Sequence, residues 1–176
     1  MALIVLLDKN DIKYLTDTQM LNAMIALIFQ GFYAKAEELI YNIPLQSISK
    51  ESLDEAVVTA AKKFNLNTKY INDVSAIFIT HTFLYPGYVI SYCTSLVPSL
   101  EIYFMEIENE GSGFAAYKEL VDRRGEKFTL EESLADAGVA SPFEDNIVHE
   151  LAEKITYYVN TGTLPKDNDD GLKDAA

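Results

Sequence analysis

The residues with the most evident chemical potential lie between His81 and Tyr92. The sequence there reads His81-Thr-Phe-Leu-Tyr85-Pro-Gly-Tyr88-Val-Ile-Ser-Tyr92. Tyr85, Tyr88 and Tyr92 are spaced by three and then four positions, so a helix that holds all three carries them on one face. Tyrosine hydroxyls and a histidine can donate hydrogen bonds to a carbonyl oxygen, or to the oxyanion that develops in acyl transfer. The alternative is an aromatic stripe packed in the core, with its hydroxyls reaching solvent.

Two further arrangements of reactive residues could carry chemistry, a zinc site and a cysteine nucleophile. His81, His149 and a carboxylate would give the three protein ligands that a catalytic zinc usually has, but the histidines are 68 positions apart and no spacing supports such a site. Cys93 could act as a nucleophile with His81 as its base, although a free cysteine is usually a small buried hydrophobic residue. The sequence contains no glycine-rich phosphate loop, no Gly-x-Ser-x-Gly and no His-Glu-x-x-His.

Composition and charge exclude several classes of function. The chain has 176 residues, with 14 Lys and Arg against 27 Asp and Glu, which gives a net charge of −13. Nucleic-acid binding needs basic residues to neutralise phosphates, so we expect no nucleic-acid partner and no binding to anionic membranes. The apolar run at residues 2–7 is too short to span a bilayer and lacks the features of a signal peptide. We expect a soluble, cytoplasmic protein.

The elements that must position these residues are helices, because no alternating strand pattern persists along the chain. The sequence predicts an all-α fold of about six helices, packed as one irregular domain over residues 1–162. Residues 1–15 are expected to be an irregular apolar lead-in, and residues 163–176 an acidic flexible tail. The predicted helices cover residues 16–41, 50–64, 86–108, 114–124, 130–137 and 142–161.

Local signals set these bounds. Capping boxes are expected at Thr16–Gln19, Thr129–Glu132 and Ser141–Glu144. Pro98 inside the helix at 86–108 predicts a kink near residues 93–97. The segment at 73–83 is compatible with a strand-like run or an irregular helix. The helix at 16–41 is apolar enough to be buried on more than one side; its stripe contains Met20, Leu21, Ala23, Met24, Ile25, Leu27, Ile28, Phe29 and Phe32.

Four segments of the sequence resemble the C-terminal helical segment of the oligoendopeptidase F and thimet oligopeptidase family of zinc metallopeptidases, and they occur in the same order as in that family. The most specific is Pro86-Gly-Tyr-Val-Ile-Ser-Tyr92, a few residues after a histidine, which is similar to the family's Pro-Phe-Tyr-Val-x-x-Tyr. The resemblance covers about residues 20–160. Its other segments are 29–41, 113–120 and 137–143.

The resemblance implies one half of an active site. In the family, zinc is held by His-Glu-x-x-His and a glutamate on the next helix, and all of these would lie before Met1 of this chain. His81 and Tyr88 are then the catalytic donors to the substrate carbonyl or oxyanion, and Tyr85 and Tyr92 bind substrate. The chain itself would hold no cofactor, whereas the complete enzyme would hold zinc. Alone it would form one wall of a peptide channel and be inactive.

Two positions depart from the family pattern and leave open which tyrosine donates to the oxyanion. Ile90 stands where many relatives have another tyrosine, and Gly87 replaces the usual phenylalanine. Glu37 matches the family's helix glutamate, for which we expect a buried or capping ion pair. We expect His149 to be structural.

Two alternatives to a peptidase half remain. The chain could be a non-catalytic helical module that binds a peptide or a protein, or an unrelated helical bundle. The expected partners are a peptide substrate together with either the missing N-terminal catalytic part or a second copy of the chain. A half cut from a larger channel leaves apolar surface uncovered, so we expect self-association to a dimer or larger.

Overall fold

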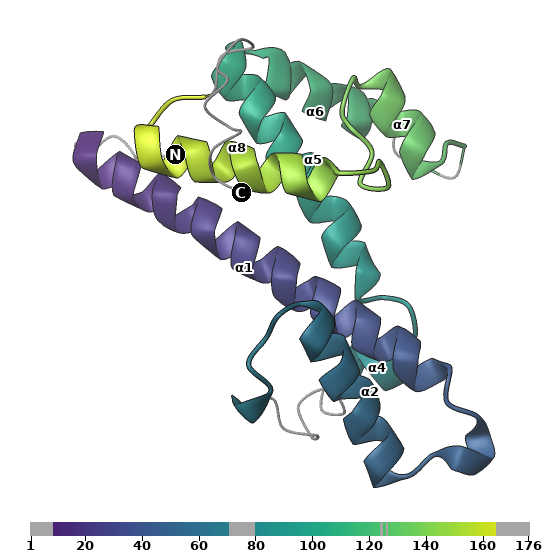
Figure 1. Cartoon of the computed structure of the whole chain (residues 1–176). Helices are drawn as coiled ribbons and strands as arrows, with labels where there is room; N and C mark the ends of the chain where they lie inside the picture. Colours follow the sequence, from purple (N-terminus) through teal and green to yellow (C-terminus); the bar gives the residue numbers. More distant parts are fainter. Residues whose placement is uncertain (1–8, 71–79, 124, 126, 165–176) are drawn as a thin grey trace. The chain divides into compact units, whose positions relative to one another are not determined.

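The computed structural model describes residues 9–70, 80–123, 125 and 127–164. Over these residues the secondary structure is entirely helical, which confirms the all-α prediction (Figure 1). No helix within these ranges is both long and apolar enough to cross a membrane. The α-helices are α1 Lys9–Tyr41, α2 Lys50–Lys63, α4 Thr80–Leu84, α5 Ile90–Glu108, α6 Ser112–Asp122, α7 Leu130–Asp136 and α8 Ile147–Thr161, and short 3-10 helices cover Leu45–Ser47 and Thr68–Tyr70.

The chain divides into two compact units. The central unit is residues 25–93, and the terminal unit combines residues 1–24 with residues 94–176. Helices α1 and α5 contribute residues to both units. Each unit has its own buried residues and is described separately below.

The core of the central unit lies between α2 and the C-terminal part of α1, which run alongside each other in Figure 1. Alanines on α2 allow the two helices to approach closely, because alanine adds little bulk at a helix contact. Ser49 caps α2: its side chain accepts a hydrogen bond from the Ser52 N–H. The buried residues of this core are Phe32, Ala36, Ile40, Ala56, Val57, Ala60 and Ala61.

The terminal unit buries large side chains from α5 and α8. Phe104 on α5 is fully buried, and its ring meets the Tyr158 ring of α8 edge-on at 6.2 Å between centroids. Leu151 and Ile155 on α8 are buried as well, as the apolar stripe of this helix predicts. A second cluster in the same unit joins α6 to α7 through Ala116, Leu134 and Val139.

Helix α7 begins and ends where its capping signals predict. The Thr129 side chain accepts from the Glu132 N–H, and the Glu132 carboxylate accepts from the Thr129 N–H at 2.8 Å. At the other end Gly138 has a φ of +67°. The Val139 N–H donates to the Leu134 carbonyl at 2.9 Å, which is the six-to-one hydrogen bond of a Schellman motif.

This cap leads to a testable expectation for stability. Thr129→Ala removes the acceptor for the Glu132 N–H and should lower the free energy of unfolding by about 1 kcal/mol. Ser141→Ala is the matched control, because the Ser141 box is not followed directly by a helix. Urea denaturation of both variants measures the difference, and an equal loss in the two would contradict the role of the Thr129 cap.

Helix α8 begins later than its start signal predicts. The Ser141 N–H donates to Glu144 Oε1 at 2.9 Å, and the Phe143 N–H donates to Ser141 Oγ at 3.3 Å, so contacts of the predicted box form. The chain then turns again at Asn146, which has a φ of +69°, and the helix begins at Ile147. The prediction of a helix from residue 142 is therefore wrong, because a residue whose backbone is in the left-handed conformation cannot continue a right-handed helix.

Helix α1 begins at Lys9, seven residues before the start that the Thr16–Gln19 box predicts. Neither glycine nor proline interrupts residues 9–15, so the helix continues through that range. A threonine acts as an N-cap only where the preceding residues are not already helical. The predicted end of this helix at Tyr41 is confirmed.

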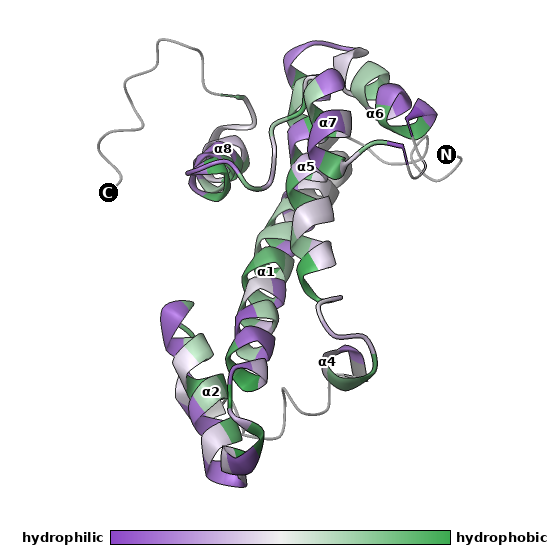
Figure 2. Ribbon diagram, turned by 90° about the vertical axis from the view of Figure 1, so that its right-hand side faces the viewer, coloured by the Kyte–Doolittle hydropathy of each residue, from purple (hydrophilic) through white to green (hydrophobic). Residues whose placement is uncertain are grey.

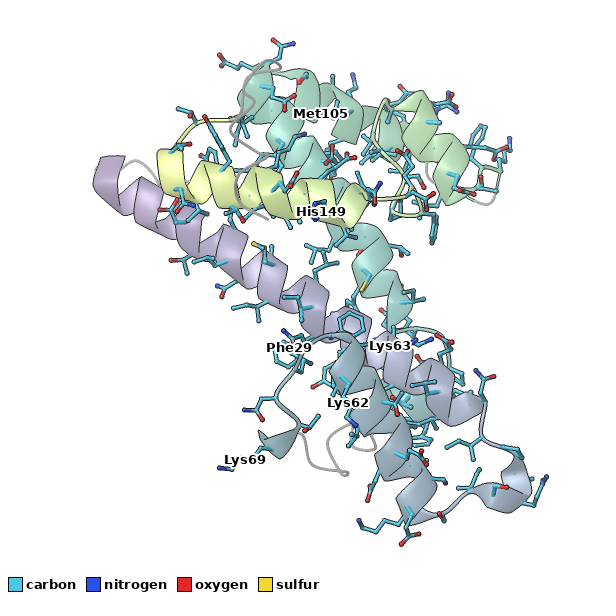
Figure 3. The ribbon with its side chains drawn as sticks, viewed as in Figure 1. Phe29, Lys62, Lys63, Lys69, Met105 and His149 are labelled. Atoms are coloured by element: carbon cyan, nitrogen blue, oxygen red, sulfur yellow. The ribbon has the colours of Figure 1, made fainter. Side chains whose placement is uncertain are left out.

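The prediction that α1 is buried on more than one side is wrong for its middle. Leu21, Ile25, Ile28 and Phe29 are between 41% and 52% exposed. In the central unit, the residue that follows α2, Phe64, lies against Gly31. The stripe of α1 thus extends beyond the end of α2. Figure 2 shows hydrophobic residues as green bands along α1, and Figure 3 labels Phe29 there.

Candidate functional site

Four side chains that the sequence singles out lie together in the central unit. The rings of His81 and Tyr88 stack at 5.0 Å between centroids with an interplanar angle of 12°. Tyr92 meets Tyr88 edge-on at 5.4 Å and His81 at 6.1 Å. Tyr85 lies 6.3 Å from His81 and 6.4 Å from Tyr88. We call His81, Tyr85, Tyr88 and Tyr92 the His-Tyr cluster.

A helix, a turn and a second helix carry the cluster. His81 is on α4, and the Tyr85 N–H donates to the His81 carbonyl at 3.0 Å as that helix ends. The Tyr88 N–H donates to the Tyr85 carbonyl at 3.0 Å and closes a β-turn. Tyr92 is in the first turn of α5. The predicted start of this helix at Pro86 is therefore wrong, because Pro86 is inside the turn from Tyr85 to Tyr88 and α5 begins at Ile90.

The question of a strand or an irregular helix at residues 73–83 is answered only in part. Residues 80–84 are helical, and residues 71–79 lie outside the described part of the chain. The kink expected near residues 93–97 stays a prediction, and α5 continues as a helix through Pro98.

The cluster is on the surface and does not pack in the core. Tyr85 is 61% exposed, Tyr88 47% and Tyr92 39%. The side chains that turn inward from the same segment are Thr82 and Val89, both buried. The three tyrosines are therefore open to solvent over much of their surface.

Electrostatics keep one of these hydroxyls protonated. Loss of solvation, followed by the neighbouring Tyr88, raises the pKa of Tyr92 above its usual value near 10. Only the neutral form of tyrosine carries the proton that it donates. Because its pKa is raised, Tyr92 is neutral and keeps this proton at physiological pH.

Helix α1 holds this segment at two points. Oε1 of Glu37 accepts a hydrogen bond from the Gly87 N–H at 2.8 Å. One turn further along α1, the Tyr41 hydroxyl donates to the Thr82 carbonyl at 2.6 Å. Tyr41 and Thr82 could not be identified from the sequence, because a contact across 41 residues leaves no spacing pattern. We expected Glu37 to form an ion pair, but its carboxylate accepts a hydrogen bond from a backbone N–H instead.

His149 and Cys93, the other reactive residues that the sequence singles out, lie outside the His-Tyr cluster. Among the described residues, no three or more His, Cys, Asp or Glu side chains are grouped so that they could hold a metal ion, and we assign no zinc ligand to them. His149 is exposed on α8, where Figure 3 labels it, with Nε2 3.2 Å from Glu153 Oε1. Burial raises the pKa of the Cys93 thiol, which disfavours the thiolate that a nucleophile requires.

The terminal unit has a shallow cavity of about 470 Å³ that the sequence does not predict. Glu106 in its wall is already engaged: Oε1 accepts from the Gly111 N–H at 2.8 Å and Oε2 from the Phe114 N–H at 3.0 Å. These bonds cap the start of α6 and lower the pKa of Glu106. The cavity is lined by Ser99, Ile102, Tyr103, Glu106, Gly113, Phe114 and Tyr117.

Comparison of the chain with protein-family models, with curated proteins and with solved structures found no match. The resemblance to oligoendopeptidase F and thimet oligopeptidase therefore stays a prediction. We therefore infer the function from the His-Tyr cluster and its surroundings in the central unit.

Proposed function

We propose that the His-Tyr cluster binds the backbone carbonyl groups of a peptide. In this proposal the chain is the C-terminal half of an oligopeptidase-type zinc metallopeptidase and forms one wall of its peptide channel. The observation that supports it is the convergence of His81 with three tyrosines on one exposed surface, at centroid distances of 5.0 to 6.4 Å.

The chemistry of the cluster suits a peptide in extended form. Such a peptide presents a polar carbonyl group at each residue, about 3.3 Å apart along the chain. A tyrosine hydroxyl donates one hydrogen bond, and a neutral imidazole donates one from its N–H. Donors that already stand in place bind more strongly to an oxyanion than to a neutral carbonyl, because charge-assisted hydrogen bonds are stronger. His81 and Tyr88 would therefore assist hydrolysis when a catalytic half is present.

The chain alone should bind peptides without cleaving them. Its sequence lacks the His-Glu-x-x-His that would supply two zinc ligands and the general base in the family that it resembles. Zinc and the activated water would come from the other half of the enzyme. A cytoplasmic location, where short peptides are turned over, belongs to the same proposal.

One observation favours a second candidate, a non-catalytic helical module that binds a peptide or a protein. Phe83 and Leu84 on α4 are at least half exposed beside the cluster. Apolar side chains next to hydrogen-bond donors can accept the side chains of a bound peptide, whether or not cleavage follows. Cleavage after addition of a catalytic half distinguishes the two candidates.

The proposal predicts that Tyr88→Phe weakens peptide binding by about three- to tenfold, since one neutral hydrogen bond contributes about 0.5–1.5 kcal/mol. The probe is a fluorescein-labelled pool of mixed-sequence nonapeptides, blocked at both ends and followed by fluorescence anisotropy. Tyr117→Phe is the matched control, because Tyr117 is an exposed tyrosine of the terminal unit. Equal affinity of the two variants would rule out Tyr88 as a donor to the peptide.

A further inference from the structure

We infer that Glu37 is a positioning residue, which fixes the His-Tyr cluster through the Gly87 N–H and touches no peptide itself. This inference rests on the proposed function of the cluster. The geometry behind it lies entirely within the central unit.

The turn that carries the cluster has one N–H with no acceptor inside the turn itself. Pro86 and Gly87 occupy the two central positions of the turn from Tyr85 to Tyr88, and Gly87 has a φ of +76°. Proline followed by a residue with positive φ is typical of a type II turn. The Tyr88 N–H makes the turn's own hydrogen bond, so the Gly87 N–H remains to be satisfied elsewhere. The Glu37 carboxylate, at 2.8 Å, satisfies it.

Burial makes this contact specific. Glu37 is only 5% exposed, and a carboxylate that is removed from water is costly unless hydrogen bonds compensate it. A hydrogen bond from an N–H to a carboxylate is stronger than one between neutral groups. The pairing of Glu37 with Gly87 therefore favours one position of the turn over others that would leave a buried carboxylate without its donor.

Glu37 and Tyr41 anchor the segment at two points that lie between His81 and Tyr88. They are one helical turn apart on α1, and their partners are the Gly87 N–H and the Thr82 carbonyl. His81 immediately precedes Thr82, and Tyr88 immediately follows Gly87. Helix α1, which has 33 residues, therefore helps to fix the stacked positions of the His81 and Tyr88 rings. These positions do not depend on the short segment alone.

The test compares two substitutions at position 37. Glu37→Gln keeps an acceptor oxygen at the same reach, whereas Glu37→Leu removes the acceptor and keeps a side chain of similar size. We expect Glu37→Gln to bind the nonapeptide pool within about twofold of the original protein and Glu37→Leu about tenfold more weakly, because the Gly87 N–H is left unpaired. Circular dichroism shows whether each variant keeps its helices. Equal affinity of Glu37→Leu and the original protein would overturn the inference.

A second measurement needs no peptide. In ¹⁵N–¹H spectra, the Gly87 amide resonance should move when Glu37→Leu removes the carboxylate acceptor, and should move less in Glu37→Gln, which keeps an acceptor oxygen. If Glu37→Leu moves the resonance but the original protein binds no peptide, the proposed function fails and the Glu37–Gly87 contact stands. If Glu37→Leu leaves the Gly87 resonance in place, the positioning role fails, whatever the peptide affinity.

Discussion

Phe104→Ala is expected to lower the free energy of unfolding by about 3–5 kcal/mol, the usual cost of removing a fully buried phenylalanine. Phe104 has no exposed surface. Its ring meets Tyr103 at 5.6 Å and Tyr158 at 6.2 Å, and Lys154 Nζ lies 5.7 Å from its centroid. Alanine leaves a cavity between α5 and α8 that these neighbours can fill only by moving.

Urea denaturation followed by circular dichroism measures this effect. Phe114→Ala is the matched control, because Phe114 is 68% exposed in the same unit. The control should change stability by less than about 0.5 kcal/mol, as surface substitutions usually do. A similar loss in both variants would mean that Phe104 is not at the centre of the core of this unit.

Gly113→Ala is also expected to have a large effect, and should lower the free energy of unfolding by about 3 kcal/mol or more. A Cβ atom at Gly113 would lie 2.3 Å from the Ile102 carbonyl oxygen and 2.8 Å from the Glu106 Cβ. The closest atom belongs to the backbone of α5, so no side-chain rotation relieves the clash. Helices α5 and α6 would have to separate, and the buried residues between α6 and α7 would lose part of their packing.

Gly31→Ala on α1 is the control for Gly113→Ala. Its Cβ would approach the Phe64 ring at 2.8 Å, and a ring at the end of a side chain can turn away. Alanine also stabilises a helix interior by about 1 kcal/mol relative to glycine, which offsets part of that cost. The two variants should differ clearly in their unfolding midpoints. If Gly113→Ala is as stable as Gly31→Ala, the close approach of α5 and α6 is contradicted.

The sequence predicts those features that depend on neighbouring residues. The box at Thr129–Glu132 and the glycine at 138 each act within one helical turn, and both ends of α7 follow from them. The proximity of His81, Tyr88 and Tyr92 also has a local origin, since a turn of four residues links the elements that carry them. Short-range spacing is enough for these features.

Features that depend on distant residues could not be predicted in this way. Ile25 and Phe29 are part of the apolar stripe of α1 and yet are 52% and 41% exposed, because the stripe does not indicate which of its positions another element covers. The box at Ser141 makes its local contacts, yet Asn146 turns the chain before the helix begins. The contact from Glu37 to Gly87 crosses 50 residues, and no pattern in the sequence indicates it.

The most direct test of peptide binding by the His-Tyr cluster is an NMR titration of the full chain with the nonapeptide pool, observing tyrosine and histidine ring resonances. Peptide binding by the cluster should shift the ring resonances of His81, Tyr85, Tyr88 and Tyr92. Tyr117 in the terminal unit should stay unchanged. Shifts at Tyr117 with none in the cluster, or no shifts at millimolar peptide, would rule out peptide binding by the cluster.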